Sequence, residues 1–412
     1  MSEVAAPASR SVLRRTFQAF RYRDFRLLWL GAFTSTTGTW MQLVAQSWLV
    51  LQLTGSAFYL GLVSFLGQLP VILFTLLGGA FADRLDRRKL LLFSQYVQTS
   101  VAITLTGLVV LGWIHVWHFL VLAFVAGSGQ AFGGPAYQAL IPTLVKREDV
   151  PNAVALNSIQ FNLARMIGPV VAGAAFAAFG AAICFGLNAL SFLAVIVALW
   201  VIQTSFVPQK TSESVLVQIK GGFQYIRGKG ALWQLTILGF VSTFCGVPIL
   251  TLLPVFAKDV FGLGATGYSN MMAISGAGSI TGALLYAGYS RAAKQGLLAL
   301  RVQIVFAFFL AAFALSRSLT LSCVILFIGG GCLITLFASI TSLVQLATSD
   351  EMRGRMMSIF MLAFRGGMPL GDLTAGFIAS RVSPSFALLL LAGLLTAVAG
   401  GFLIARSGVE RL

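Results

Sequence analysis

The stretch Gly79-Ala80-Phe81-Ala82-Asp83-Arg84-Leu85-Asp86-Arg87-Arg88-Lys89 separates two long apolar runs. Its charged residues all fall between Asp83 and Lys89, and four of them are basic. Lys and Arg concentrate in the short cytoplasmic loops of membrane proteins. The stretch therefore predicts two membrane-spanning helices that are joined by a cytoplasmic loop.

The composition of the whole chain supports a membrane protein. Of its 412 residues, 58% are hydrophobic and 10% are charged, whereas soluble domains carry about 25% charged residues. The net charge of +16 is distributed over short loops. We therefore expect membrane lipids with anionic headgroups as partners of this charge, and no nucleic acid.

Several functional classes are disfavoured by what the sequence lacks. His115 and His118 share one loop, and the four cysteines form no CxxC pair, so we expect no metal site. No Gly-rich segment ends in Gly-Lys-Ser or Gly-Lys-Thr, which argues against ATP-driven transport. No nucleophile and base are arranged as in an enzyme. We expect no cofactor and no enzymatic activity.

The apolar runs predict an all-α membrane protein with twelve transmembrane helices, since a span needs about 20 mostly apolar residues. They form two six-helix bundles, residues 27–202 and 231–406, with tails at 1–26 and 407–412. The linker 203–230 carries apolar residues at helical spacing, which predicts an amphipathic helix on the cytoplasmic surface. The expected spans begin near Leu27, Ala57, Leu90, Trp117, Asn152, Ala181, Leu232, Thr266, Gly296, Leu319, Met356 and Pro384.

The basic residues fix the orientation of these spans. Of the 28 Lys and Arg residues, 23 lie in the tails, in the even-numbered loops or at the adjoining helix ends. Only Lys258, Arg317 and Arg381 lie on the other side, and Arg165 and Arg365 fall inside spans. This bias predicts a multi-pass membrane protein with both termini in the cytoplasm.

The two bundles also repeat each other in sequence. A charged segment precedes both the fifth and the eleventh span. Within these spans, Arg165 and Arg365 are 200 positions apart, as are Pro169 and Pro369. A parallel repeat of this kind is expected of two bundles related by an axis along the membrane normal.

The opening stretch resembles the loop between helices 2 and 3 of the major facilitator superfamily, with Asp86 where that family usually has Gly. Further segments resemble a narrower branch, the transmembrane secretion effectors, which includes bacterial enterobactin exporters and related drug and metabolite efflux carriers. These segments are Phe20–Arg26, Gly129–Pro142, Asn152–Ser158 and Asn162–Pro169.

The resemblance implies a gating role for the opening stretch. In the family, the Asp of this loop interacts with the cytoplasmic start of helix 11, where a carboxylate satisfies free amide groups. Such a latch would hold the cytoplasmic face shut. The residues expected to form it are Gly79, Asp83, Arg84, Arg87, Arg88, Asp350 and Glu351.

Ionisable residues inside the membrane are costly and are functional candidates for that reason. Arg165 and Arg365 are expected to bind substrate, because a guanidinium group holds anions in a fork. The alternative is that each arginine stabilises the bundle, Arg365 by pairing with Asp372 two turns along its helix. Asp372 is the expected proton-coupling residue, since it is the only carboxylate placed deep in a span.

Polar residues at helical spacing mark other expected cavity positions. We expect these residues to bind substrate. The alternative is that they join neighbouring helices, as amides and hydroxyls often do in membranes. Gly168-Pro169 with Gly173 resembles a helix 5 signature of antiporters, although Pro and Gly also form simple kinks. The polar candidates are Gln42, Gln46, Gln130, Tyr137, Thr335 and Ser339.

These observations predict a secondary transporter that works by alternating access. The resemblance implies a proton-coupled exporter in the cytoplasmic membrane of a bacterium. Its substrate would be a small hydrophobic or anionic molecule, such as a drug, a siderophore or a metabolite, and we expect a monomer. A lysophospholipid transporter is the alternative. A membrane sensor or scaffold without transport activity is disfavoured, because it would leave the charges inside the spans unexplained.

Overall fold

The computed structural model describes residues 17–202, 230–289, 295–349, 352–405 and 408, and all regular elements in these ranges are helices. The predicted amphipathic linker helix lies outside the described residues. The long helices begin within four residues of the expected positions, which confirms the predicted fold class.

The long helices fall into two sets along the chain. The first set is α2 (Arg23–Thr54), α3 (Ala57–Arg84), α4 (Arg87–Val110), α5 (Val116–Leu140), α6 (Val150–Phe179) and α7 (Ala181–Val201). The second set is α9 (Gly230–Gly246) with α10 (Pro248–Val255), α11 (Ala265–Tyr289), α12 (Gln295–Leu315), α13 (Leu319–Leu346), α14 (Arg353–Arg381) and α15 (Pro384–Ile404). The short elements are η1 (Gln18–Arg21), η2 (Ile141–Leu144), η3 (Arg147–Asp149) and the π-helical turn η4 (Phe256–Val260).

Nine helices within the described residues are long and apolar enough to cross a membrane. The three long helices that fall short are α2, α4 and α14, which carry many polar or charged residues. The most polar of these is α14, which contains Arg353, Arg355, Arg365, Asp372 and Arg381. Helices of this kind are tolerated in a bilayer when their polar side chains face other helices or a polar cavity.

The packing within the two halves follows the sequence repeat. In the first half α3 packs against α5, α2 against α6 and α7, and α4 against α5 and α7. In the second half α11 packs against α13, α9 against α14 and α15, and α12 against α13 and α15. Each pair in one half thus has a counterpart six spans later, as the repeat predicts.

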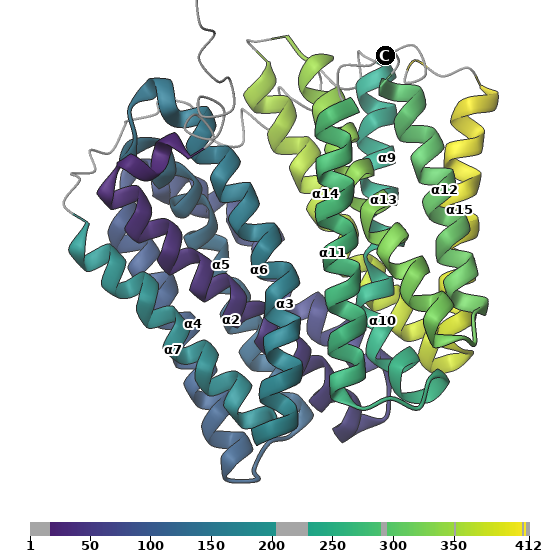
Figure 1. Cartoon of the computed structure of the whole chain (residues 1–412). Coiled ribbons are helices and arrows are strands. Elements are labelled where there is room, and N and C mark those ends of the chain that lie inside the picture. The colour runs from purple at the N-terminus through teal and green to yellow at the C-terminus, as the bar shows by residue number, and fades with distance from the viewer. Residues whose placement is uncertain (1–16, 203–229, 290–294, 350–351, 406–407, 409–412) are drawn as a thin grey trace, which may run out of the picture.

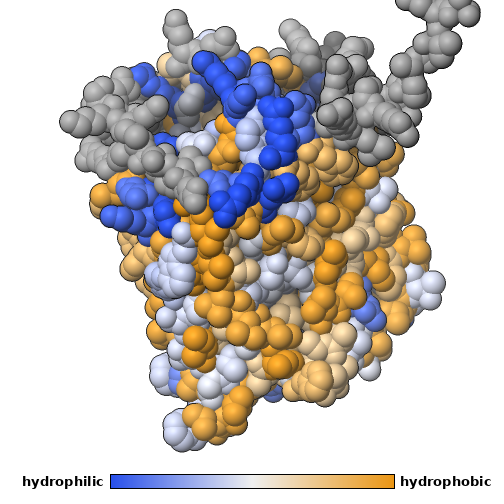
Figure 2. All heavy atoms as spheres, turned by 60° about the vertical axis from the view of Figure 1, so that its left-hand side comes forward, coloured by the Kyte–Doolittle hydropathy of each residue, from blue (hydrophilic) through white to orange (hydrophobic). Residues whose placement is uncertain are grey.

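The halves meet along two helix pairs, α3 with α14 and α6 with α11, and α10 adds contacts to α2 and α3. Figure 1 shows the first half, in purple to teal, beside the second half, in green to yellow, with the C-terminal end at the top. Figure 2 shows hydrophilic residues gathered at this upper end and a largely hydrophobic flank below them. The charged end and the apolar flank match a protein that spans a bilayer.

Close backbone contacts hold the helices of each half together, and glycine permits them. A Cβ atom on Gly127 of α5 would collide with the carbonyl oxygen of Gly67 in α3, whereas one on Gly107 of α4 would meet open space.

We expect Gly127→Ala to lower the melting temperature of the detergent-solubilised protein, because overpacking costs about 1–3 kcal/mol. Gly107→Ala should leave the melting temperature unchanged or raise it, because Ala favours a helix by roughly 1 kcal/mol over Gly. Equal melting temperatures for the two variants would contradict the α3–α5 contact.

Candidate functional site

Asp372 of α14 lies between the two halves of the molecule. Its side chain is 2% exposed, and Ser64 of α3 donates a hydrogen bond from Oγ to Oδ2 at 2.5 Å. The hydroxyl group of Thr251 in α10 also lies beside the carboxyl group. Oδ1 has no hydrogen-bond partner that meets geometric criteria among the described residues. The sequence identified Asp372, but not the hydroxyl groups that surround it.

Glycine brings the two helix backbones together at this point. A Cβ atom on Gly61 would collide with the carbonyl oxygen of Asp372, and one on Gly376 would lie 2.7 Å from the carbonyl oxygen of Ala57. We call this contact the outer seam (Ala57, Gly61 and Ser64 against Asp372 and Gly376), because the charge distribution predicts these helix ends to be extracellular. The outer seam is closed in this structure.

The register of the outer seam also identifies the residues that lie level with each other further along α3 and α14. Since Gly61 faces Asp372 and Ala57 faces Gly376, the helices run antiparallel. Two turns along, seven residues further on each helix, Gln68 comes level with Arg365, and both are exposed. Neither side chain is therefore covered by the opposite helix at the level of this second pair.

The pairing of Arg365 with Asp372, the alternative to substrate binding, is not found among the described residues. Arg365 is exposed, whereas Asp372 is buried and bonded to Ser64. The ion pairs found among the described residues all involve Arg21. Two turns along one helix bring these side chains to a similar face, but α3 covers one of them and leaves the other open.

The second contact between the halves joins α6 and α11. A Cβ atom on Gly173 would lie 2.9 Å from Cβ of Ser269, and one on Gly276 would lie 3.2 Å from the carbonyl oxygen of Arg165. The Gly173 of the antiporter-like signature thus lies at a contact between the halves. Arg165 lies at the edge of this contact.

The guanidinium group of Arg165 lies over an aromatic ring. Its Cζ atom is 5.6 Å from the ring centroid of Trp40 in α2, and the Trp40 ring meets that of Phe161 edge-on, with centroids 6.2 Å apart. Arg165 is half-buried, and no hydrogen bond or ion pair joins its side chain to another described residue. A cation–π contact leaves the in-plane N–H groups free to bind an anion.

The other polar candidates take part in contacts between or within helices. Gln42 accepts a hydrogen bond from Asn188 at 2.7 Å, Tyr137 donates to Asn157 at 2.7 Å, and Thr335 donates to the carbonyl oxygen of Gly282 at 3.2 Å.

The remaining three candidates differ in exposure. Ser339 is buried and bonds within its own helix. Gln130 is exposed and accepts from Gln98 at 3.5 Å, and Gln46 is half-buried. The bonds of Gln42, Tyr137 and Thr335 fit the alternative that these residues join helices.

The described part of the opening stretch is bonded to its own half. Arg87 donates to the carbonyl oxygen of Ala139 at 3.1 Å, and Arg88 donates to that of Trp200 at 3.0 Å. Asp86 accepts a hydrogen bond from the backbone N–H of Arg88 and caps α4. The surroundings of Gly79, the side chains of Asp83 and Arg84, and residues Asp350 and Glu351 lie outside the described part, so the latch stays a prediction.

A clamp that the sequence did not reveal joins residues within or next to two of the segments quoted for the family resemblance, Phe20–Arg26 and Asn152–Ser158. Arg21 donates to Asp149 at 2.6 Å, and Tyr22 donates to the same carboxylate oxygen at 2.6 Å. Asn152 accepts from the backbone N–H of Ala19 at 2.8 Å. Asp149 is buried, so the clamp fixes the chain before α2 to the start of α6.

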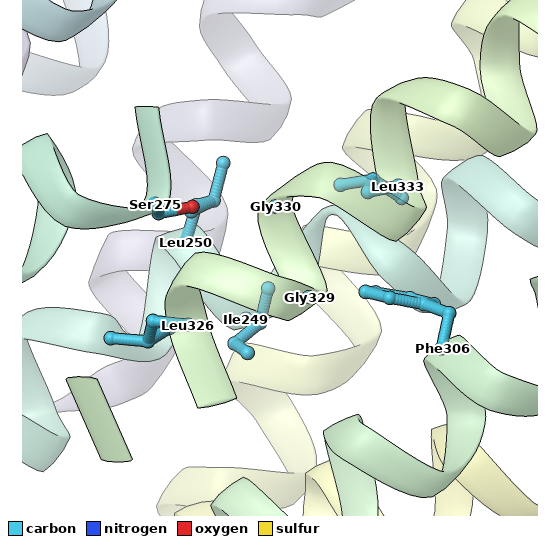
Figure 3. Close-up of a pocket in the computed structure, with 8 residues that line it drawn as sticks. All are labelled: Ile249, Leu250, Ser275, Phe306, Leu326, Gly329, Gly330 and Leu333. Atoms are coloured by element: carbon cyan, nitrogen blue, oxygen red, sulfur yellow. The ribbon is translucent and has the colours of Figure 1, made fainter. Parts of the chain in front are cut away.

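A small apolar pocket lies in the second half, between α10, α11, α12 and α13 (Figure 3). It contains none of the residues expected to bind substrate, and we assign it no role. Its lining residues are Ile249, Leu250, Ser275, Phe306, Leu326, Gly329, Gly330 and Leu333.

Comparison with known proteins agrees with this geometry. The family described as transmembrane secretion effector matches residues 14–410. The chain is 28% identical to the multidrug efflux pump Tap of Mycolicibacterium fortuitum, covering 92% of this chain and 95% of the pump. It is 23% identical to the enterobactin exporter EntS of Salmonella choleraesuis, covering 87% and 86%. A bacterial homologue of the human lysosomal transporter Spinster, in an inward-facing and occupied conformation, has a TM-score of 0.74 at 13% identity, with 99% of both chains covered.

The register of α3 and α14 predicts which residues meet when the predicted cytoplasmic ends of these two helices come together. In a background without native cysteines, we expect Gln68→Cys with Arg365→Cys to cross-link only when the predicted cytoplasmic side is closed.

The matched control is Phe58→Cys with Phe377→Cys, whose native rings are 6.4 Å apart at the outer seam. The two yields should change in opposite directions under conditions that shift the conformational equilibrium. If the yields rise and fall together, the register is wrong.

Proposed function

Because the chain belongs to the transmembrane secretion effector family of major facilitator transporters, we propose that it is a proton-coupled exporter of a small hydrophobic or anionic molecule. Members of this family are transporters, not enzymes, and several relatives are named as efflux proteins for drugs, macrolides or siderophores. The observation that carries the proposal is the placement of three ionisable side chains, Arg165, Arg365 and Asp372, next to the two contacts between the halves.

Arg165 supports an anionic or hydrogen-bonding substrate. A guanidinium group inside a membrane protein is costly unless a partner or water surrounds it. The described residues offer Arg165 only the ring of Trp40. An anionic group of the substrate would supply the missing partner, while Trp40 and the half-exposed Phe161 contact its apolar part.

Arg365 supports binding from the other half of the molecule. It is exposed, and no described side chain forms an ion pair with it. Arg365 lies on α14, six spans after Arg165 on α6, so the repeat places the two cations in opposite halves. A substrate between the halves would contact both cations.

Asp372 supports coupling to protons. It is buried at the outer seam, where its protonation state depends on whether water reaches the contact. Protonation of this carboxyl group therefore affects the same contact that must open to the outside.

The alternating-access cycle follows from the two contacts between the halves. In this structure they are closed towards the predicted extracellular ends, while Gln68 and Arg365 are exposed. We propose that this form faces the cytoplasm and receives the substrate there. In the opposite form, the predicted latch between Asp83 and the start of α14 holds the cytoplasmic side closed.

The proton-coupling role is tested by Asp372→Asn in proteoliposomes with an imposed pH gradient, screened with drugs, siderophores and lysolipids. We expect the variant to lose transport driven by the gradient and to retain exchange of labelled substrate without a gradient. Asp259→Asn is the control, because it removes the same charge from an exposed position. Gradient-driven transport at the native rate in Asp372→Asn would exclude Asp372 as the coupling residue.

The substrate-binding role is tested by substitutions of Arg165. For an anionic substrate found in this screen, Arg165→Gln should raise KM by about tenfold or more, because a hydrogen bond to a charged group contributes roughly 1.5–3 kcal/mol.

Arg165→Lys should restore part of this loss, since Lys keeps the charge without the fork. Arg381→Gln, at an exposed position, is the control and should leave KM unchanged. The same KM for the native chain and Arg165→Gln would exclude a direct contact.

A further inference from the structure

Ser64 connects the proton site to the opposite half of the molecule. Asp372 and Thr251 belong to the second half, whereas Ser64 belongs to α3 of the first half. The hydrogen bond from Ser64 Oγ to Asp372 Oδ2 therefore exists only while the outer seam is closed. We propose that Ser64 is the positioning residue that links protonation of Asp372 to closure of the outer seam, an inference that rests on the proposed proton role of Asp372.

The surroundings of Asp372 contain little that could stabilise a negative charge. Ser64 and Thr251 contribute hydroxyl groups, and no described residue bonds to Oδ1 with good geometry. The charged residue of α14 closest in sequence, Arg365, is exposed two turns away. The titratable side chains on the described parts of the neighbouring helices α3, α9, α10, α13 and α15 are Tyr59, Cys245, Cys323 and Cys332.

The closed seam therefore favours the neutral carboxyl group. Burying a carboxylate costs several kcal/mol unless other groups pair with it, and here Ser64 donates the one short hydrogen bond. Opening of the seam exposes the carboxyl group to water, which stabilises the ionised form. Uptake of a proton from outside thus favours closure, which is the step that returns an empty exporter to the cytoplasmic side.

Ser64 sets how strongly the seam responds to the proton. The hydroxyl group stabilises the ionised carboxylate in the closed seam more than the neutral carboxyl group, because hydrogen bonds to charged groups are stronger. Loss of the hydroxyl group therefore makes the closed seam more dependent on protonation. The largest effect is expected at alkaline pH, where Asp372 is ionised.

Among the described residues, the contact between α6 and α11 contains no carboxyl group that is bonded to a serine of the opposite half. Ala172, which lies 200 positions before Asp372, takes the equivalent place in the repeat, and the contact is made by Gly173 against Ser269. A proton consequently acts on one of the two contacts between the halves. Ser269 offers a matched control, since it is a serine at a contact between the halves without a carboxylate partner.

The experiment measures opening of the outer seam without substrate. Spin labels are placed at the exposed residues Gln52 and Val382, in the two halves, after the native cysteines have been replaced. Pulsed electron paramagnetic resonance then gives the distance distribution in lipid nanodiscs from mildly acidic to mildly alkaline pH. In the otherwise native chain we expect the open fraction to rise with pH.

Ser64→Ala should raise the ratio of open to closed molecules at alkaline pH by about tenfold, with little change at acidic pH. Ser64→Thr should restore the native profile, Ser269→Ala should leave it unchanged, and Asp372→Asn should abolish the pH dependence.

The inference is overturned if Ser64→Ala follows the native profile, or if it shifts the ratio equally at every pH, as a packing defect would. It is also overturned if Asp372→Asn keeps the pH dependence. The measurement is independent of transport. A chain that shows the expected profiles but exports nothing would refute the proposed export and support the role of Ser64.

Discussion

The structure depends on one contact between its halves, where the carboxyl group of Asp372 is buried against Ser64. In the interior of a membrane protein no bulk water compensates a charge, so every ionisable side chain must find a partner, lose its charge or line a polar space. Asp372 meets this condition with groups from both halves. Its surroundings therefore change whenever the halves move, and in the proposed role of Asp372 this links protonation to the conformation.

Close approach of the backbones makes this contact possible. Gly61 and Gly376 bring α3 and α14 near enough for a serine hydroxyl group to reach a carboxylate on the opposite helix. A side chain at either position would separate the helices and leave the carboxyl group without its partner. Such small residues allow van der Waals contact where the hydrophobic effect gives no driving force between helices. The two glycines and Asp372 thus form one functional unit, although no ion pair joins them.

The sequence predicted the fold in detail because the dominant physical terms are local. Apolar length determines the spans, and Lys and Arg determine which loops remain in the cytoplasm. It also identified Asp372, Arg165 and Arg365, since charges within spans are rare. It could not predict Ser64 or Phe161, because serine and phenylalanine are common in membrane helices. Their roles arise only when α3 meets α14 and when α6 meets α2.

The placement of the ionisable groups limits how substrate and proton can be coupled. Direct competition would require a cation near Asp372, but Arg365 is exposed two turns away, and Arg165 lies at the contact between α6 and α11. In the proposed exporter, substrate on Arg165 and a proton on Asp372 therefore act at different contacts. The helices of each half pack against one another, and one hydrophobic core contains residues of both halves, so a change at one contact is transmitted to the other. In the proposed exporter, coupling results from the rigidity of the halves, and substrate and proton need not exchange partners directly.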